Sequence, residues 1–375
     1  MREQILKLPK VELHSHLEGT IKPHLVHQIA QRNGIKLDQN LFDNKGGYVW
    51  SDFPSFLVAY DGASSCLKNK QDYRDIMYQY LKDCASENVI YMETFISPDH
   101  AAECGISYDD MILGCVEGIN DAEDDFGIVG RIIVTCVRHL GPKKGIDVAQ
   151  KMVDNPHPYI VGFGMGGDEL AFTLKDFEPA FNIAANANYP CTVHAGEISG
   201  PESVWDAINH LPIARIGHGV RSIEDDILLR ELVERNIHLE ISPGSNLALS
   251  IYPSWSSHPF KFIMTKGISV SLNSDDPPFF DTSIGQEYQN CAKNFKLSIE
   301  DLKNISLNSI NDSDTFEINS VKILYSLPIN SFSLVADKDN EIYLVKIVNS
   351  ENNPYGENDE NYLKFVQNQN TDNRK

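Results

Sequence analysis

Eight short apolar runs rich in β-branched residues recur along the chain, and each run ends in polar or glycine-rich residues. Runs of this length and composition, bounded by turn-forming residues, predict β-strands whose two faces are both buried. The predicted strands cover residues 11–16, 89–97, 128–137, 159–165, 191–197, 214–220, 238–242 and 268–275.

Stretches with the 3.6-residue period of an amphipathic helix lie between most of these runs. Strands that alternate with helices predict crossover connections and a parallel sheet, and eight such units predict closure into a barrel. We therefore expect an α/β fold, a (β/α)8 TIM barrel, over residues 1–312. The clearest helical stretches are 72–85, 108–126, 174–186, 202–210 and 224–234.

The connection after the first predicted strand is long, from about residue 20 to 88, and has room for more than one helix. It includes the aromatic-rich segment from Trp50 to Tyr60. An insertion after strand 1 lies on the face where the active sites of such barrels form, so it could serve as a lid or a pocket wall. The alternative is an ordinary peripheral helix whose apolar face points inward.

The composition changes after about residue 310, where Asn and Asp become dense and the helical pattern weakens. Residues 331–348 read as two strands around a hairpin-like turn from Ala336 to Glu341. We predict an atypical C-terminal extension over residues 313–350 and a disordered tail over 351–375, which has little to bury. We expect the extension to affect stability or assembly rather than chemistry.

The overall composition limits the classes of partner. Apolar residues make up 42% of the chain and charged residues 23%, which is enough apolar surface for a large core. A formal net charge of −21 argues against binding to nucleic acid or to an anionic membrane, and it favours a small neutral or cationic ligand. The seven cysteines are scattered and the first ten residues lack an apolar signal core, so we expect a soluble, cytoplasmic protein.

Residue types that bind metals gather at the ends of four predicted strands. His14 and His16 are two residues apart on the first strand, so both imidazoles face the same way and form a chelating pair. His194 ends the fifth strand, His218 the sixth, and the pair Asp275-Asp276 the eighth. Because the carboxyl ends of barrel strands converge, these side chains predict a mononuclear site for Zn²⁺ or a similar metal.

Glu197 lies three residues beyond His194, where it could transfer protons without binding the metal. A metal with an open position lowers the pKa of bound water toward neutrality and so generates a nucleophile. His218 and one of the two aspartates could orient or deprotonate that water. This set of groups suits hydrolysis at an sp² carbon that carries a leaving amine or amide.

Six segments, in order along the chain, resemble motifs of the adenosine deaminase family, and the similarity covers about residues 5–310. The segments are Val11-Glu-Leu-His-Ser-His-Leu-Glu-Gly19, Gly166-Gly-Asp-Glu169, His194-Ala-Gly-Glu197, Arg215-Ile-Gly-His-Gly219, Ser242-Pro-Gly-Ser-Asn-Leu247 and Ser271-Leu-Asn-Ser-Asp-Asp-Pro277.

The resemblance implies a role for nine residues. One zinc ion per subunit would be bound by His14, His16, His194 and Asp275. Glu197 would protonate the purine N1, and His218 and Asp276 would hold and activate the hydroxide that attacks C6. Gly167 would contact the purine N3 through its N–H, Glu18 would bind a ribose hydroxyl, and His16 and Asp276 would also lie against the substrate.

The identity of the purine depends on three positions. Glu18 stands where adenosine-specific enzymes usually carry Asp, and Glu here is also common in related adenine deaminases. Gly217 stands where adenine-specific relatives tend to carry Asp, and Gly167-Asp168-Glu169 resembles the nucleoside enzymes. We therefore predict deamination of adenosine and deoxyadenosine to the inosine products and ammonia, in purine salvage. The alternative is an adenine deaminase or a deaminase of N6-substituted purines.

Three further readings are less favoured. AMP would need cationic side chains for its phosphate, and only Arg215 and Arg221 lie near the motifs. A two-metal amidohydrolase would need a bridging lysine or carboxylate after strand 4, which here ends Gly164-Met-Gly-Gly-Asp-Glu169 without a lysine. A purine-binding barrel without catalysis would have lost Glu197, His218 or Asp276, and all three are present.

Overall fold

The computed structural model describes residues 2–312, 332–336 and 342–346. The chain divides into two compact units, Met1–Glu317 and Ile318–Lys375, which are described separately. In the part of the chain that is described, no helix is long and apolar enough to cross a membrane.

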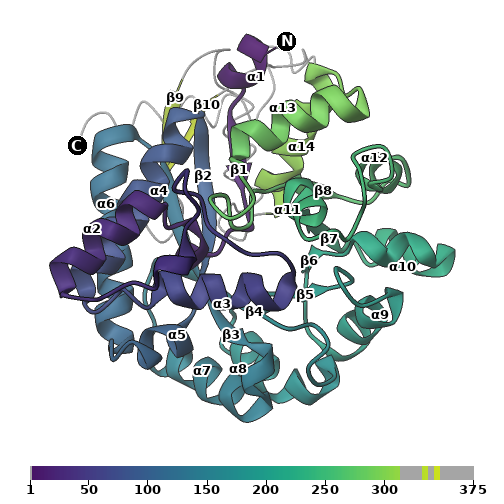
Figure 1. The fold of residues 1–375 in the computed structure, drawn as a ribbon. Helices are drawn as coiled ribbons and strands as arrows, with labels where there is room; N and C mark the ends of the chain where they lie inside the picture. The colour runs from purple at the N-terminus through teal and green to yellow at the C-terminus, as the bar shows by residue number, and fades with distance from the viewer. Residues whose placement is uncertain (1, 313–331, 337–341, 347–375) are drawn as a thin grey trace, which may run out of the picture. The chain divides into compact units, whose positions relative to one another are not determined.

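The first unit is built on eight parallel strands that follow one another in chain order around the sheet. Figure 1 shows the strands at the centre and the helices in a ring around them, which confirms the predicted (β/α)8 TIM barrel. The strands are β1 (Lys10–Glu12), β2 (Val89–Ile96), β3 (Val129–Val137), β4 (Ile160–Gly166), β5 (Cys191–Ala195), β6 (Arg215–His218), β7 (His238–Ile241) and β8 (Val270–Leu272).

Helices connect the strands and bury their apolar faces against the barrel. Those of the first half are α1 (Arg2–Lys7), η1 (Leu17–Thr20), α2 (Pro23–Asn33), η2 (Gln39–Leu41), α3 (Phe53–Ser64), α4 (Lys70–Ser86), α5 (Pro98–Glu103), α6 (Tyr108–Phe126), η3 (Arg138–Leu140) and α7 (Pro142–Asp154). Those of the second half are η4 (Leu174–Phe177), α8 (Glu178–Asn186), α9 (Pro201–His210), η5 (Val220–Glu224), α10 (Asp226–Glu234), α11 (Pro243–Ala248), α12 (Phe260–Thr265), α13 (Ile284–Phe295) and α14 (Ile299–Asp312).

The barrel is closed by the segments that follow β1 and β8 rather than by the strands themselves. Regular β1 ends at Glu12 and β8 at Leu272, so both strands are shorter than predicted. Beyond them the backbone N–H of His16 donates to the carbonyl of Asp275 (3.1 Å), and the N–H of Asp275 donates to the carbonyl of His14 (3.2 Å). Asp275 has a φ of 64°, in the left-handed region that a non-glycine residue rarely adopts, which interrupts regular pairing there.

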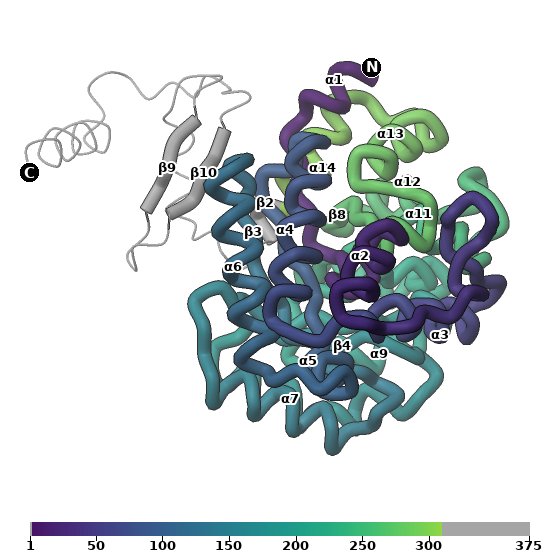
Figure 2. The backbone as a smooth tube through the Cα atoms, turned by 60° about the vertical axis from the view of Figure 1, so that its left-hand side comes forward, coloured from purple at the N-terminus to yellow at the C-terminus, as the bar shows by residue number. Residues whose placement is uncertain are grey.

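Helices α4 and α6 run side by side on the outside of the barrel, as Figure 2 shows. Glycines in α6 allow this close approach, since a Cβ at Gly118 would lie 2.6 Å from the carbonyl oxygen of Arg74 in α4. The start of α4 is fixed by a capping box, in which Asn69 accepts from the N–H of Asp72 and Asp72 accepts from the N–H of Asn69.

The long insertion after β1 contains α2, α3 and α4, and α3 crosses one end of the barrel in Figure 1. Its aromatic side chains pack on the segment that follows Asp275. The Tyr48 ring stacks on Phe279 with centroids 3.9 Å apart, and Trp50 Nε1 donates to the Phe279 carbonyl (3.0 Å). The insertion is thus fixed to the segment after β8, which carries the predicted metal ligand Asp275 and the predicted catalytic residue Asp276.

The second unit contains the two strands β9 (Phe332–Ala336) and β10 (Ile342–Lys346), which pair antiparallel. The two strands predicted within residues 331–348 are therefore present. Residues 337–341 of the predicted turn and the predicted tail, 351–375, lie outside the described residues. The domain boundary at residue 312 and the role of the extension stay predictions.

Candidate metal and acid/base site

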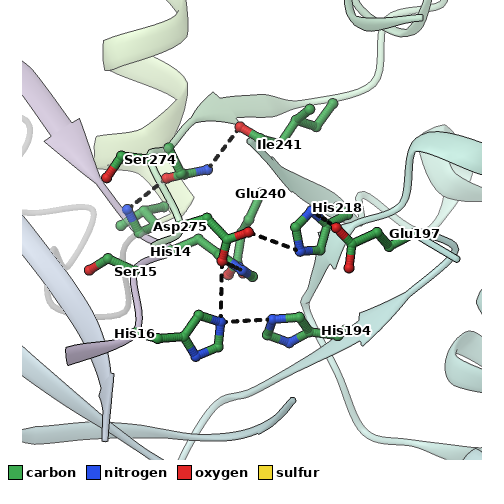
Figure 3. Close-up of polar contacts among 12 residues, drawn as sticks. His14, Ser15, His16, His194, Glu197, His218, Glu240, Ile241, Ser274 and Asp275 are labelled. Atoms are coloured by element: carbon green, nitrogen blue, oxygen red, sulfur yellow. Dashed lines mark hydrogen bonds and ion pairs between the residues drawn. The ribbon is translucent and has the colours of Figure 1, made fainter. Parts of the chain in front are cut away.

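Four side chains converge at the carboxyl end of the barrel. The ligand atoms of His14, His16, His194 and Asp275 lie within 4.8 Å of one another. The Nε2 atoms of His16 and His194 are 3.1 Å apart, and Asp275 Oδ1 lies 3.3 Å from His16 Nε2 and 3.5 Å from His14 Nε2. Figure 3 shows Asp275 at the centre of this group.

The hydrogen bonds of the histidines leave their lone pairs free for a cation. His194 Nδ1 lies 2.8 Å from the carbonyl oxygen of Met165, an atom that only accepts, so the hydrogen is on Nδ1 and Nε2 carries the lone pair. His14 Nδ1 is bound in the same way to Glu240 (2.8 Å), while its buried Nε2 has no hydrogen-bond partner. Three imidazoles and one carboxylate aimed at a common point fit a divalent metal such as zinc.

A buried ion-pair network holds His14, one of the four candidate metal ligands, in place. Glu240 binds His14 through one oxygen and Arg215 Nε through the other (2.9 Å). Arg215 also binds Glu93 (2.7 Å), and although burial opposes ionisation, the charge of Arg215 keeps the pKa of Glu240 below its ordinary value. The ionised Glu240 therefore fixes the tautomer and the ring plane of His14.

The acid/base candidates lie on the other side of Asp275. Glu197 Oε1 is 3.4 Å from His218 Nδ1, and His218 Nε2 is 3.9 Å from Asp275 Oδ2. Burial, reinforced by the charges of Asp275 and Glu169, raises the pKa of Glu197 well above its ordinary value. The arrangement therefore favours a protonated Glu197, which is the form that a general acid needs.

Asp276 is buried, and its Oδ1 atom has no hydrogen-bond partner. Burial and then the charge of Asp275 raise the pKa of Asp276 well above its ordinary value. A Cβ atom at Gly19 would overlap this carboxylate, so the glycine provides the space that Asp276 occupies. A buried acceptor without a partner is costly, which makes Asp276 a candidate for contact with substrate or water.

Eight of the nine predicted site residues line one cavity, and His14 lies just outside it. Gly167 has a φ of +100°, and a Cβ there would lie 2.9 Å from His139 Nδ1, so both conformation and space require glycine. Helix α3 forms part of the cavity wall, in agreement with a pocket-wall role for the insertion. The wall residues from α3 are Phe53, Phe56, Leu57, Tyr60 and Asp61.

Comparison with known proteins identifies the family. A sequence model described as adenosine deaminase matches residues 9–326. The chain belongs to the adenosine deaminase family.

Several relatives are similar over most of their length. An adenine deaminase from Agrobacterium fabrum is 45% identical over 288 residues, which are 77% of this chain and 88% of that protein. The crystal structure of adenine deaminase from Arthrobacter aurescens is 27% identical, with a TM-score of 0.78, and the match covers 84% of this chain and 96% of that one. An amidohydrolase from Burkholderia ambifaria, with bound Zn, is 26% identical with a TM-score of 0.79 over 87% and 91% of the two chains.

Sequence reasoning missed several supporting residues of this deaminase fold. Glu169 is the clearest, because its carboxylate accepts four backbone N–H groups from the loop that carries Glu197. The donors are Gly196 (2.5 Å), Glu197 (3.1 Å), Ile198 (2.7 Å) and Ser199 (2.9 Å). An acidic residue at the end of a family motif was the available signal, but its distance in sequence from Glu197 concealed the contact.

The two arginines considered for phosphate binding do not face the cavity. Arg215 is buried in the ion-pair network with Glu93 and Glu240. Arg221 binds Glu224 and the carbonyl of Ile198. Neither lines the cavity. The structure therefore gives no support to recognition of AMP through these residues.

Replacing Glu169 tests whether its carboxylate holds the Glu197 loop. We expect Glu169→Gln to lower kcat by about 100-fold, since a small misplacement of a catalytic group has effects of that size. Bound metal should stay unchanged because no ligand is touched. Steady-state kinetics and metal analysis make the measurement, with Asp168→Asn as the matched control for loss of a neighbouring charge. Equal kcat in the two variants would contradict this role for Glu169.

Removing the metal tests the ligand cluster. We expect dialysis against a chelator to lower the melting temperature and added zinc to restore it, since a ligand at 100 times its Kd stabilises by about 2.7 kcal/mol. His14→Ala should lose the response to zinc, and His24→Ala, an exposed histidine outside the cluster, should keep it. Differential scanning fluorimetry gives the readout. A melting temperature that changes with neither chelator nor zinc would exclude a metal bound by these four residues.

Proposed function

We propose that the protein is an adenine deaminase, which hydrolyses adenine to hypoxanthine and ammonia. The observation that carries the proposal is the 45% identity to an adenine deaminase over 88% of that enzyme. The same name belongs to a structural relative at 27% identity. Adenine, the alternative in the sequence analysis, thus replaces adenosine as the preferred substrate.

The sequence argument for adenosine loses its force because its positions serve the protein's own packing. A Cβ at Gly217 would lie 2.7 Å from His14 Cε1, so packing of the ring accounts for this glycine. Asp168 accepts the N–H of Leu170 (2.9 Å), and Glu169 binds the Glu197 loop. Contacts within the protein thus account for Gly217 and Glu169, and these two residues give no separate support for a nucleoside over a free base.

Glu18 gives local support for a nucleobase substrate. It is buried, and its two oxygens already accept from Tyr73 (3.2 Å), Tyr60 (3.4 Å) and the N–H of Ser97 (3.3 Å). A ribose hydroxyl at this position would compete with three protein donors. A buried carboxylate that is already satisfied gains little from a further donor, and the tyrosines reduce the space for a sugar.

The proposed chemistry assigns one task to each residue. A metal held by His14, His16, His194 and Asp275, which we propose to be one zinc ion, would supply a Lewis acid that lowers the pKa of an attacking water. Glu197 gives its proton to the purine N1, which makes C6 electrophilic, and the backbone N–H of Gly167 binds N3. His218 and Asp276 hold the water against C6.

The protons balance over the reaction. Asp276 takes one proton from the water as the water oxygen bonds to C6. Asp276 then passes this proton to the departing amine, which leaves as ammonia. Glu197 recovers a proton from the new C6 hydroxyl as the carbonyl forms. Water thus supplies one proton to ammonia and one to replace the proton given to N1.

Substrate comparison tests the proposed specificity. We expect kcat/KM for adenine to exceed the values for adenosine, deoxyadenosine, AMP and N6-methyladenine by about 100-fold or more, since steric and polar mismatches discriminate on this scale. Ultraviolet spectroscopy combined with ammonia release measures turnover of each compound by the zinc-loaded enzyme. Faster turnover of adenosine would refute the specificity and leave a purine deaminase. Two metal equivalents per chain would favour the two-metal reading.

Replacing Glu197 tests the proton donor. We expect Glu197→Gln to keep zinc and to bind adenine, while kcat falls by about 10²–10⁴-fold, the usual contribution of a general acid or base. Metal analysis and equilibrium binding of adenine separate this loss from damage to the site. Glu234→Gln, at an exposed position in α10, is the control. Turnover near that of the control would remove Glu197 from the mechanism.

A further inference from the structure

A buried amide joins two of the three proposed acid/base groups, Glu197 and His218. Asn246, in α11, is fully buried. Its Nδ2 atom donates one hydrogen to Glu197 Oε1 (3.1 Å) and lies 3.2 Å from His218 Nδ1. Its Oδ1 atom lies 3.2 Å from Nε2 of His258, a residue that the family motifs quoted above do not include.

His218, Asn246 and His258 form a hydrogen-bonded relay, and one backbone N–H fixes the direction of each hydrogen bond in it. The N–H of Phe260 donates to His258 Nδ1 (3.2 Å), so that nitrogen carries a lone pair. Burial lowers the pKa of His258 to about 3, so the ring is neutral and its hydrogen is on Nε2. His258 Nε2–H then donates to Asn246 Oδ1, which fixes the orientation of the amide.

The fixed amide determines the state of His218. The NH₂ group of Asn246 only donates, so the His218 nitrogen that faces it, Nδ1, must accept and can carry no hydrogen. An imidazole that lacks a hydrogen on Nδ1 carries it on Nε2. The opposite amide orientation would place Oδ1 against Glu197 and His218, and Nδ2 against the His258 Nε2–H.

We propose that Asn246 and His258 are positioning residues that hold His218 in the tautomer with its hydrogen on Nε2, so that His218 donates to the attacking water. The catalytic consequence of this tautomer rests on the proposed function. His218 then orients the water oxygen and keeps its own proton throughout the reaction. The proton that water loses goes to Asp276, whose Oδ1 has no hydrogen-bond partner among the described residues.

The relay also orients the general acid. Asn246 Nδ2 donates to Glu197 Oε1, which leaves Oε2 of Glu197 to carry the proton for the purine N1. Without the amide of Asn246, Glu197 Oε1 would still lie 3.4 Å from His218 Nδ1. With the Glu197 proton on Oε2, that contact would require a hydrogen on Nδ1 of His218 and would reverse the tautomer.

Nitrogen NMR of the zinc-loaded enzyme, labelled with ¹⁵N-histidine, measures the tautomer directly. The His218 signals are assigned from the spectrum of His218→Gln, and the other histidines serve as internal references. We expect an unprotonated Nδ1 and a protonated Nε2 in the wild-type enzyme. A protonated Nδ1, or an Nε2 without hydrogen, would overturn the proposal. Since no purine is present, this result does not depend on which substrate the enzyme uses.

Replacing Asn246 tests its part in this arrangement. In Asn246→Asp no donor faces His218, so we expect its Nδ1 to become protonated, with a loss in kcat of at least 10-fold and a smaller change in KM. An unchanged His218 signal in this variant would refute the role of Asn246. Zinc content and the melting temperature report whether the variant is folded.

His258 supplies the conservative pair. His258→Gln retains a donor for Asn246 Oδ1 and should keep the wild-type His218 tautomer and most of kcat. His258→Phe keeps an aromatic ring of similar size beside Tyr252 but removes the donor, so the Asn246→Asp spectrum and the loss in kcat should reappear. Equal behaviour of the two His258 variants would show that packing alone matters there and would overturn the relay.

Discussion

The backbone pairing between the segments after β1 and β8 is the interaction on which the site depends. The N–H of His16 donates to the carbonyl of Asp275, whose own N–H donates to the carbonyl of His14. These two bonds close the barrel, and they also hold three of the four candidate ligands within reach of one cation. A barrel is held together by contacts around its whole circumference. The ligand geometry therefore benefits from the stability of the entire fold, and the left-handed backbone of Asp275 is maintained by that closure.

The acid/base groups are held differently, by buried polar side chains that act on loops. Glu169 gathers the N–H groups of the loop around Glu197, and its charge also contributes to the raised pKa of Glu197. Asn246 joins the Glu197 carboxyl to His218. Each of these groups lies in a low-dielectric setting, where hydrogen bonds are strong and a missing partner is costly. The same burial that makes the network expensive to build thus gives Glu197 the protonation state that the chemistry needs.

The barrel and the convergence of its chemistry could be predicted from the sequence, because hydrophobic period and strand-end position are local signals. His194 and Glu197 follow one buried strand, and eight such ends must meet in a closed sheet. Contacts between distant segments could not be predicted. Glu169 meets the loop at Glu197 only after β4 and β5 pair, and Gly217 is required by the ring of His14, which lies on another strand. Because packing against His14 accounts for Gly217, this glycine gives no separate evidence on which purine the enzyme accepts.

The shape and charge of the cavity argue for a small, uncharged base. Among its described lining residues none is lysine or arginine, so a phosphate would find no cationic partner. The net charge of −21 makes the surroundings of the cavity unfavourable for an anion. Glu18 already accepts hydrogen bonds from Tyr60 and Tyr73, so a sugar hydroxyl would compete with these two donors. The proposed reaction of adenine needs only a proton donor for N1, an N–H for N3 and a base for the attacking water, and Glu197, Gly167 and Asp276 line the cavity for these three tasks.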